Sequence, residues 1–478
     1  MTWNLTHKRF QFHTEKPFHR GRTHVKLDKS SIEHNRQSAF MDTKQFLDRI
    51  SRRQFLGSSA KNAAGVAAGM VAVGTAGANA AGNDGEPVRL GLIGLRGHGE
   101  RLGLEFLRHT NSVVVSVCDV DETALSRVAR TLGEHQGVYP RRESDFRHVL
   151  DDSRVDAVVI ATPDHWHAHM TTLACAAGKD VYLEPPIAHT VEEIEQVVRS
   201  AERAKRVVQV GLQQRSGDHF RSAVDFVRSG QIGEVWIAKA WTVHRRKSVG
   251  RHQPSDPPET LDFDLWRGPA PASPFYANRS HQNWRWFWDY GAGELGHLGV
   301  HLLDVARWGL GLESPTSIVS VGSQQAFDDD RQTPDTLHVS YRYPDAARTI
   351  EWEHRLWTNH GIEGRNAAVA FYGEQGTLIV DRGGWKVYGV KDAPSSAASD
   401  CLTPHLRNFI ECVRTRQTPS ASLSATAASS MLVHLGNIAY RVGPELQFDS
   451  NAMNFGTNKS ANALLSREYH ADWPLPIT

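Results

Sequence analysis

The sequence has little cysteine. Cys118, Cys175, Cys401 and Cys412 are the four cysteines among 478 residues, and none of them forms a CxxC pair. Closely spaced cysteines are typical of zinc sites, and an even set in a short chain is typical of a disulfide framework. Neither arrangement is present, so we interpret these cysteines as ordinary packing residues.

No charge of one sign dominates the chain. Lysine and arginine together number 54 and aspartate and glutamate 53, which gives a formal net charge of +1. General nucleic-acid binders usually present a strongly basic face. The one basic region, residues 7–36, has little apolar periodicity. The charge balance therefore argues against a nucleic-acid partner.

A long hydrophobic run is also missing. The apolar stretch at residues 63–78 is shorter than the ~18–20 residues of a membrane span, and glycines interrupt it. Arg52 and Arg53 precede it and Ala-Asn-Ala follows it, which is typical of a cleaved secretory signal. The paired arginines before "QFL" resemble a twin-arginine signal, which exports folded proteins. We expect residues 41–80 to be such a signal, to engage the twin-arginine export machinery, and to direct a protein without a membrane span to the periplasm.

Residues 1–40 do not fit this signal, because an export leader begins close to its arginines. Met41 is a better start, so we expect residues 1–40 to be a disordered extension or the product of a misassigned start codon. The rest of the chain is long enough for two ordinary domains.

Short apolar runs alternate with helical patterns in residues 87–215. The order of strand, turn and helix begins at "VRLGLIG" and recurs as far as "RVVQVGLQQRS". Such alternation produces a parallel, doubly wound sheet with helices on both faces. The segment is therefore predicted to be an α/β domain of the Rossmann type, a class that binds dinucleotides.

The pattern changes in residues 216–478. Runs such as "EVWIAKAWTVHRR" and "DTLHVSYRYP" alternate apolar and polar residues, as antiparallel strands with one solvated face do. A Trp-, Pro- and Gly-rich insertion at 260–293 and a helix at 294–308 interrupt these runs, and residues 393–400 form a linker before helices from 402 to about 440. We predict an α+β domain with a large, mostly antiparallel open sheet that serves substrate binding and oligomerisation.

A glycine-rich loop follows the first predicted strand. In a G-x-G-x-x-G loop the first glycine allows a tight turn, the second lets the pyrophosphate approach, and the third allows helix packing. The matching positions here are Gly94, Arg96 and Gly99, and Gly97 can take over part of the second role. Arg96 can contact phosphate through its side chain. The alternative is a helix-entry loop without a ligand.

Asp119 ends the second predicted strand, 20 residues after Gly99. An acid at this place hydrogen-bonds the ribose hydroxyls of the cofactor and repels a 2′-phosphate, which favours NAD over NADP. The alternative is a solvated acid at a strand end.

Three histidines, His165, His167 and His169, invite a metal interpretation because the outer two are spaced i, i+4. A third ligand on the same helix face is missing, since His167 points elsewhere on a helix. We therefore predict no metal site.

Several longer stretches occur in a characteristic order over about residues 88–475: "GLIGLRGHG", "CDVD", "VVIATPDHWHAHM", "GKDVYLEPP", "QVGLQQRS", "NWRWFWDYGAGELGHLGVHLLDVARWGL" and "LLSREYHADWPLP". Each is weakly specific alone, but the ordered set resembles the Gfo/Idh/MocA oxidoreductase family, in particular its exported members. The resemblance implies an NAD(P)-binding Rossmann domain followed by an α/β domain whose open sheet faces the active site. Most members move hydride between nicotinamide and a sugar or polyol.

The resemblance also implies cofactor contacts at the strand ends. Thr162, Pro163 and His167 match positions that line the cofactor in the family. Gln213, at the end of the sixth strand, is expected at the same edge.

The chain departs from the family after the fifth strand. The family usually has Glu-Lys-Pro there, with the lysine reaching the nicotinamide ribose and the reacting carbon, whereas this chain has Glu184-Pro185-Pro186. Proline offers no proton, no charge and no backbone N–H. Position 185 therefore cannot fulfil the role of that lysine, and Glu184 remains a candidate for catalysis and cofactor binding.

A second departure lies on the predicted helix. Family dehydrogenases carry Asp and His four residues apart, and here His297 stands in place of the acid, with His301 in the second position. Glu294 and Asp304 extend the spacing to i, i+3, i+7, i+10, which places all four on one helix face. His301 is the candidate general base, since its ordinary pKa of ~6.5 suits proton transfer near neutral pH. His297 can donate, accept or bind a metal, or be structural.

Further substrate contacts are expected at the end of the sixth strand, on the helix and in the Trp-rich insertion: Arg215, Asp304, and Arg285, Trp286 and Tyr290, respectively. Aromatic rings stack on the apolar faces of sugars. For any single Trp the alternative is core packing.

Three functions fit these observations. The first is a nicotinamide-dependent oxidoreductase that acts on a sugar, polyol or glycoside. The second is a redox-neutral hydrolase or lyase, because the family's NAD-dependent glycosidases also lack the lysine and carry histidine in place of the acid; they oxidise, eliminate, hydrate and reduce again. The third is a non-catalytic binding subunit. We expect a small carbohydrate substrate, a tightly bound NAD and a homo-oligomer.

Overall fold

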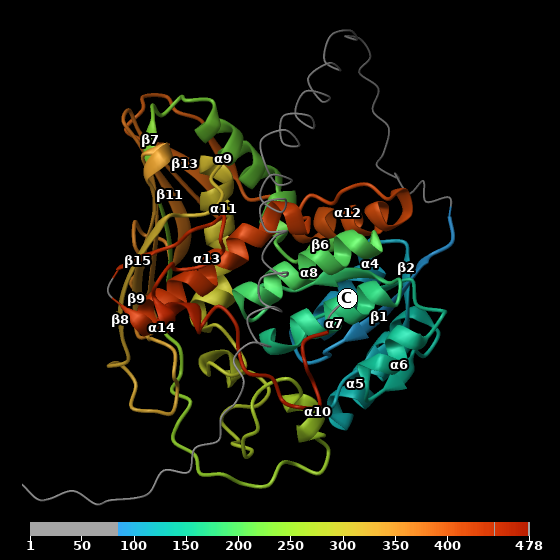
Figure 1. The fold of residues 1–478 in the computed structure, drawn as a ribbon. Coiled ribbons are helices and arrows are strands. Elements are labelled where there is room, and N and C mark those ends of the chain that lie inside the picture. The colour runs from blue at the N-terminus through green and yellow to red at the C-terminus, as the bar shows by residue number, and fades with distance from the viewer. Residues whose placement is uncertain (1–84, 444, 477–478) are drawn as a thin grey trace, which may run out of the picture. The chain divides into compact units, whose positions relative to one another are not determined.

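The computed structural model describes residues 85–443 and 445–476. The predicted signal at 41–80 and the predicted extension at 1–40 lie outside the described residues. Within the described part, no helix has both the length and the apolar character needed to cross a bilayer. Figure 1 shows a sheet with helices on both faces and a second, larger sheet with helices on one face.

The first sheet has six parallel strands in the order β3-β2-β1-β4-β5-β6. The strand order reverses between β1 and β4, and ligands of such sheets bind there, outside the carboxyl ends of the strands. The prediction of a doubly wound Rossmann sheet is confirmed. The strands are β1 (Val88–Ile93), β2 (Ser112–Cys118), β3 (Arg141–Glu143), β4 (Ala157–Ile160), β5 (Asp180–Leu183) and β6 (Val208–Val210).

Helices connect these strands and cover both faces of the sheet. Three of them begin at side-chain caps: Asp121 accepts from the backbone N–H groups of Thr123 and Ala124, Asp145 accepts from that of Arg147, and Thr190 accepts from that of Glu193. Such caps satisfy N–H groups that the first helical turn leaves free. The helical segments are α4 (His98–His109), α5 (Glu122–Gln136), α6 (Phe146–Asp151), α7 (Asp164–Ala176), α8 (Val191–Ala204) and the short η1 (Gln213–Ser216).

The second sheet has nine strands in the order β14-β13-β12-β11-β7-β10-β9-β8-β15. Its described strand pairs are antiparallel except β7 with β10, so the prediction of a mostly antiparallel sheet is confirmed. The strands are β7 (Val235–Val243), β8 (Ser317–Ser323), β9 (Thr336–Tyr343), β10 (Arg348–Arg355), β11 (Ala367–Gly373), β12 (Thr377–Asp381), β13 (Gly384–Tyr388), β14 (Ser395–Ala397) and β15 (Glu445–Gln447). Residues 393–400 were expected to be a linker, but they contain β14, which pairs with β13 at the sheet edge.

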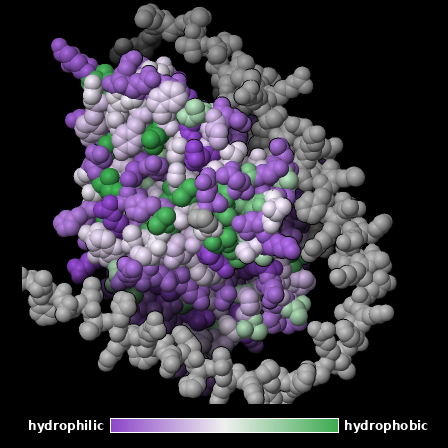
Figure 2. Space-filling view, turned by 60° about the vertical axis from the view of Figure 1, so that its left-hand side comes forward, coloured by the Kyte–Doolittle hydropathy of each residue, from purple (hydrophilic) through white to green (hydrophobic). Residues whose placement is uncertain are grey.

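Helices α9, α11 and α13 cover one face of this sheet (Figure 1). The other face carries exposed large apolar side chains, and Figure 2 shows hydrophobic residues on this side of the molecule in small groups among hydrophilic ones. The remaining helical segments are α9 (Asp218–Arg228), α10 (Phe263–Arg267), η2 (Asn283–Trp286), η3 (Leu295–Gly299), α11 (Val300–Leu310), η4 (Pro344–Ala346), α12 (Leu402–Thr415), α13 (Leu423–Val442) and α14 (Lys459–Asn462).

The helix predicted at 294–308 is not uniform. Its first part, η3, is π-helical, and the regular α-helix α11 begins only at Val300. π-helical turns close i→i+5 hydrogen bonds and recur at functional sites. The i, i+3, i+7 spacing of an α-helix therefore does not apply through His297, which lies inside the π segment.

The insertion at 260–293 reaches from the second domain to the first sheet. Glu122 donates its backbone N–H to the Thr260 carbonyl at 2.9 Å, and Asp262 donates to the Val120 carbonyl at 3.0 Å. The insertion has its own core, in which Trp266, Phe287 and Tyr290 are buried. It therefore packs as a structured arm beside the carboxyl end of β2.

Helix α12 belongs to the core of the first sheet, although it follows the second sheet in the chain. Leu406, Phe409 and Ile410 pack in one cluster with residues of β1, β2, α4 and α5. The ring of Phe409 lies 6.1 Å from that of Phe106 and 5.7 Å from that of Tyr182. The chain thus returns to its first domain before it ends.

Replacement of Phe409 tests this packing. Phe409→Ala leaves a cavity in the first core, so we expect the free energy of unfolding to fall by about 3–5 kcal/mol in urea titrations. Glu411→Ala, on the exposed side of the same helix, is the matched control and should change stability by less than about 0.5 kcal/mol. Equal small effects for both variants would show that α12 is only loosely attached.

Candidate active site

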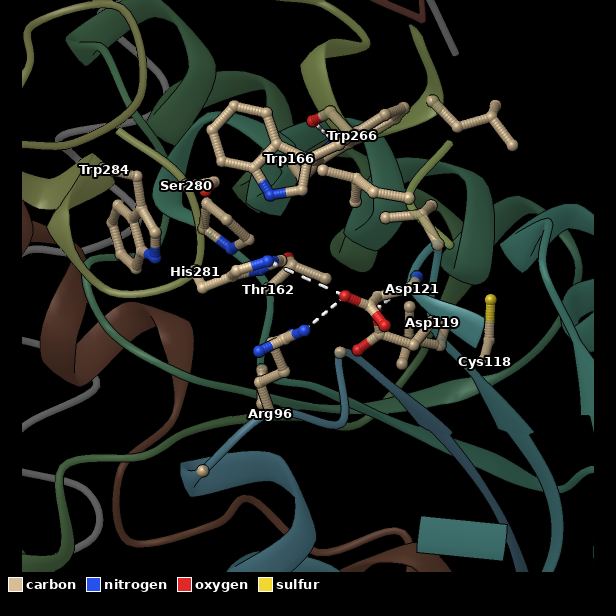
Figure 3. Close-up of a pocket in the computed structure, with 18 of the residues that line it drawn as sticks. Arg96, Cys118, Asp119, Asp121, Thr162, Trp166, Trp266, Ser280, His281 and Trp284 are labelled. Carbon is tan, nitrogen blue, oxygen red and sulfur yellow. Dashed lines mark hydrogen bonds and ion pairs between the residues drawn. The ribbon is translucent and has the colours of Figure 1, made fainter. Parts of the chain in front are cut away.

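A cleft of about 630 Å³ lies at the carboxyl ends of β1, β2 and β4. The glycine loop and the ends of β2 and β4 form one wall, and the insertion forms the other (Figure 3). Seven of the predicted site residues line this cleft: Gly94, Arg96, Gly97, Asp119, Thr162, Pro163 and Arg285. The fold therefore gathers most of the predicted cofactor residues around one space.

The glycine loop has the geometry that a dinucleotide requires. Gly94 has φ +85°, and a Cβ there would lie 2.7 Å from the Ala161 carbonyl oxygen. A Cβ on Gly99 would collide with the carbonyl of Gly94. Gly97 has φ +53° and would meet nothing within 4 Å, so open space adjoins the start of α4. The N–H groups and the positive end of that helix suit a pyrophosphate.

Asp119 is fixed by the backbone at the end of β2. Its carboxylate accepts the N–H of Leu95 at 2.7 Å and that of Asp121 at 3.0 Å. Burial raises the pKa of Asp119, and these two amides oppose the shift. Each oxygen retains a second lone pair, which a ribose hydroxyl can use.

An ionic cluster that no sequence pattern indicated lies at the mouth of the cleft. The guanidinium of Arg96 pairs with the carboxylate of Asp121, and Nε2 of His281 lies 3.7 Å from the same oxygen (Figure 3). Asp121 stands in the "CDVD" stretch but was not singled out, and His281 lies in an insertion whose path the sequence did not reveal. Arg96 therefore points toward a carboxylate instead of filling the space in front of Gly97.

Aromatic side chains from distant segments also line the cleft. Trp166, Trp266 and Trp284 stand around its upper wall in Figure 3. Trp166 donates its indole N–H to the Trp266 carbonyl at 3.0 Å, which joins α7 to the insertion. The Trp-rich run was predicted to stack on the substrate, and Trp286 was the residue selected. Trp286 is instead buried in the core of the insertion.

Glu184, which precedes the position of the family's lysine, faces His98, the first residue of α4. Its Oε2 lies 3.1 Å from Nε2 of His98, which lines the cleft and was not predicted. Burial pushes the pKa of Glu184 upward, but His98 and His301 outweigh it and hold the pKa below its ordinary value. The carboxylate in turn raises the pKa of His98. Pro185 joins Pro186 through a cis peptide bond beside this pair.

His301 and His297 are both held as neutral imidazoles. Burial lowers the pKa of His301 to about 4 and takes that of His297 well below its ordinary value. Nδ1 of His301 donates to Oε1 of Gln214 at 3.2 Å, which leaves the lone pair on Nε2. Arg285 donates to Nε2 of His297 at 2.9 Å; since a guanidinium only donates, the proton of His297 sits on Nδ1.

A buried acid lies behind Arg285. Asp164, the first residue of α7, accepts the N–H of Ala292 at 3.2 Å, and burial raises its pKa to about 7 against the opposing charge of Arg285. Asp164 was not predicted, although it stands in the "ATPDHWH" stretch. The protonation state of Asp164 therefore determines the charge next to Arg285, the arginine that orients His297.

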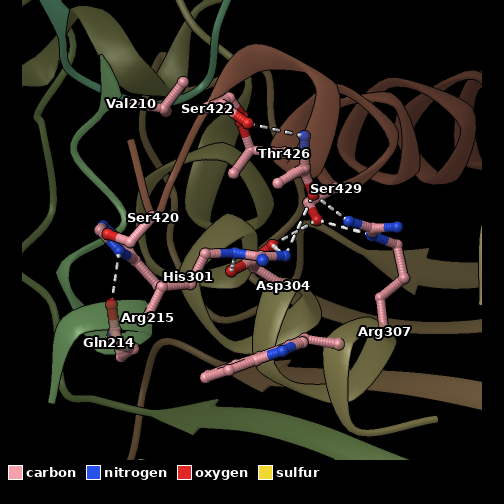
Figure 4. Close-up of polar contacts among 12 residues, drawn as sticks. Val210, Gln214, Arg215, His301, Asp304, Arg307, Ser420, Ser422, Thr426 and Ser429 are labelled. Carbon is pink, nitrogen blue, oxygen red and sulfur yellow. Dashed lines mark hydrogen bonds and ion pairs between the residues drawn. The ribbon is translucent and has the colours of Figure 1, made fainter. Parts of the chain in front are cut away.

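Two predicted substrate residues form an ion pair in the interior. Arg215 donates to both carboxylate oxygens of Asp304 at 2.8 Å, and Ser429 donates to one of them at 2.6 Å (Figure 4). Asp304 has no exposed surface and Arg215 is 8% exposed. The pair joins η1 of the first domain to α11 and α13, and neither residue lines the cleft.

Glu184, His297, His301 and the predicted residues not yet described all lie outside the cleft lining. The hydroxyl of Tyr290 is 3.0 Å from that of Ser273 inside the insertion. His167 is 1% exposed, and its nitrogens face the carbonyl oxygens of Pro186 at 2.7 Å and Thr162 at 3.0 Å. His167 thus ties together two loops that border the site. Gln213 is half-buried at the end of β6. The roles assigned to these residues stay predictions.

The other two histidines of α7 also bind backbone carbonyls of distant segments. His165 contacts the Trp266 carbonyl at 3.1 Å, and His169 contacts those of Trp473 and Pro474 at 3.0 Å. Among residues 85–443 and 445–476, the structure has no cluster of three metal-ligating side chains. These histidines attach the insertion and the C-terminal segment to α7.

A substitution can distinguish a structural role of the Arg215–Asp304 pair from a role in substrate binding. Asp304→Asn leaves a buried guanidinium without its counter-charge, so we expect the free energy of unfolding to fall by about 3 kcal/mol. Asp218→Asn, an exposed acid paired with Arg221, should cost less than about 0.5 kcal/mol. A variant with full stability but a raised KM would instead place Asp304 at the substrate.

Comparison with known proteins follows the same division. Residues 88–212 match the family profile described as "Oxidoreductase family, NAD-binding Rossmann fold". Residues 238–475 match the profile "Oxidoreductase family, C-terminal alpha/beta domain".

Two curated relatives match part of the chain. The glycosyl hydrolase family 109 protein 2 of Shewanella sp. (strain ANA-3) is 32% identical over 167 residues, and the alpha-N-acetylgalactosaminidase of Shewanella oneidensis is 28% identical over 163 residues. Each match covers 33% of this chain and 36% of the relative, so the chain spans about a third of the length of these relatives.

Among solved structures, the WlbA dehydrogenase of Bordetella pertussis, in complex with NADH and UDP-GlcNAcA, superposes with a TM-score of 0.58 at 18% identity. The superposition covers 76% of this chain and 99% of that one, and it shows a shared fold. The two profiles, matched in order over both domains, show that the chain belongs to the Gfo/Idh/MocA oxidoreductase family.

Proposed function

We propose that the protein is an NAD-dependent enzyme that hydrolyses a glycoside by a redox-neutral route. The observation that carries this proposal is the pair of neutral imidazoles, His297 and His301, near a loop in which Pro185 offers no proton. A relative named alpha-N-acetylgalactosaminidase supports a glycoside as the substrate class. Bound NAD would supply a hydride acceptor at the start of the cycle and a hydride donor at its end.

The cleft suits this cofactor. The open side of Gly97 and the start of α4 would hold the pyrophosphate, and the carboxylate of Asp119 would hold the adenosine ribose. An acid at that position repels a 2′-phosphate, which favours NAD over NADP. Thr162 and Pro163 would border the cofactor from the end of β4.

His301 is the proposed general base. Its Nδ1 is used by Gln214, and its Nε2 has no hydrogen-bond partner in the described part of the chain. That nitrogen can take the proton of a sugar hydroxyl as the hydride leaves the same carbon. Arg285 fixes His297 next to it, and His98 keeps Glu184 ionised nearby.

The cycle leaves the nicotinamide unchanged. Oxidation turns a ring hydroxyl into a carbonyl, which acidifies the neighbouring C–H. Loss of that proton expels the aglycone as an alkoxide, which takes up a proton, and water then adds across the new double bond. Return of the hydride would restore the hydroxyl, so that glycoside and water would become sugar and alcohol.

A net dehydrogenase is the second candidate. The same base and cofactor positions support a cycle that ends with reduced nicotinamide released. The similar fold of a dehydrogenase described in complex with NADH and a nucleotide sugar favours it.

We further propose that the protein acts in the periplasm, after export by the twin-arginine machinery. The support is the pattern of Arg52, Arg53 and Ala-Asn-Ala at 78–80. A homo-oligomer through the open face of the second sheet is supported by exposed apolar side chains on its strands, among them Ile237 of β7 and Val321 of β8.

The route can be tested with the purified protein, an aryl α-N-acetylgalactosaminide and D₂O as solvent. We expect release of the aryl alcohol without lasting absorbance near ~340 nm, and deuterium in the sugar at the carbon next to the oxidised one. Steady accumulation of reduced cofactor would favour the dehydrogenase instead. Hydrolysis without deuterium uptake would exclude the elimination step.

The role of His301 gives a second test. His301→Ala should lower turnover at least about 100-fold while NAD remains bound, and His109→Ala on the exposed side of α4 should have no effect. Because the pKa of His301 is about 4, the wild-type rate should stay level as the pH falls from neutral and drop as the base becomes protonated near that value. Unchanged rates in the alanine variant would remove His301 from the mechanism.

A further inference from the structure

One wall of the cofactor cleft belongs to the insertion, which is attached to the other wall close to Asp119. Backbone hydrogen bonds join Thr260 and Asp262 to the turn after β2, and Leu261 forms a β-bridge with Asp121. Residues 280–285 line the cleft further along. A ligand that reaches Asp119 and the glycine loop would therefore lie under this segment.

A single carboxylate ties three segments together at the cleft mouth. Oδ1 of Asp121 accepts the N–H groups of Thr123 at 2.9 Å and Ala124 at 3.2 Å, and Oδ2 faces Arg96 and His281. The side chain of Asp121 is 4% exposed and that of Arg96 is 40% exposed, so the carboxylate is shielded from water while the guanidinium stays partly solvated. The glycine loop, the start of α5 and the insertion all meet at this group.

The insertion is held in an unfavourable backbone conformation at this point. His281 has φ +62°, in the left-handed region that residues other than glycine rarely adopt. Such conformations persist where surrounding contacts impose them. The contact with Asp121 is one interaction that keeps His281 over the cleft.

We propose that Arg96, Asp121 and His281 form a latch that closes the insertion over the bound dinucleotide and slows its release. The proposal rests on NAD as the cofactor of the proposed function. It also gives a physical reason for the departure from glycine at position 96, since glycine has no side chain to reach Asp121. A cycle that returns the hydride to the sugar requires a cofactor that stays bound between the two transfers.

The latch is tested by the rate at which the complete protein releases NADH. The protein is loaded with NADH, mixed with a large excess of NAD, and followed by the decay of bound-NADH fluorescence. Asp121→Asn keeps the cap of α5, because asparagine caps helices as well as aspartate does, but removes the charge. Arg96→Gln keeps the backbone and removes the other charge. We expect each variant to release NADH about tenfold faster, as loss of one charge-assisted contact would cause.

Two further variants make the result specific. Arg142→Gln changes an exposed arginine that pairs with Glu122, next to the latch but outside it, and should release NADH at the wild-type rate. The double variant Arg96→Gln/Asp121→Asn should be no faster than Asp121→Asn alone, because that variant already removes the contacts of Asp121 with both Arg96 and His281. Additive effects, or release rates equal to the wild type, would overturn the latch.

The results that would overturn the latch differ from those that would overturn the proposed function. Wild-type release rates in the variants, together with intact glycoside hydrolysis, would overturn the latch alone. Faster release in a protein that turns over no glycoside would support the latch and overturn the hydrolase. A wild-type protein that binds no dinucleotide would overturn both.

Discussion

The parallel direction of the first sheet is the constraint on which the site depends. Because all six strands run the same way, the ends of β1, β2, β4 and β5 open onto one edge. The glycine loop, Asp119, Thr162 and Glu184 each follow one of these strands, so they lie along that edge although they are far apart in sequence. Close packing of Gly94 and Gly99 then brings the start of α4 to the same place.

Burial determines the protonation state of the two histidines that the second domain contributes to the site. The helix that carries His297 and His301 is fixed to the first domain by the interior pair of Arg215 and Asp304, so its imidazoles sit where water is largely excluded. Exclusion of water disfavours the charged imidazolium, which keeps both rings neutral. A neutral imidazole with a free nitrogen can accept a proton, whereas a protonated lysine at position 185 would donate a proton. In the proposed function the site would combine one base, His301, with a hydride-accepting cofactor and leave proton donation to other groups, such as the His98–Glu184 pair.

Several residues that look catalytic in the sequence serve to join segments. The histidines of α7 each bind a backbone carbonyl of a distant segment, and Asp304 neutralises a buried arginine. The distinction matters because a polar side chain that loses its partner in the interior costs more free energy than one at the surface. Loss of such a residue would reduce activity through the position of the loops.

The sequence by itself determined the two sheets, the family and the wall of the cleft that follows the strands, because strand periodicity, glycine spacing and strand-end residues are local properties. Gly94 and Asp119 were found in this way, and Thr162 through the resemblance to the family. The tertiary structure alone decided what faces them. His98 meets Glu184, and His281 meets Asp121, across separations that no local pattern encodes. Such pairs depend on the path of an irregular insertion and on which side chains are buried, and both are set by packing of the whole chain.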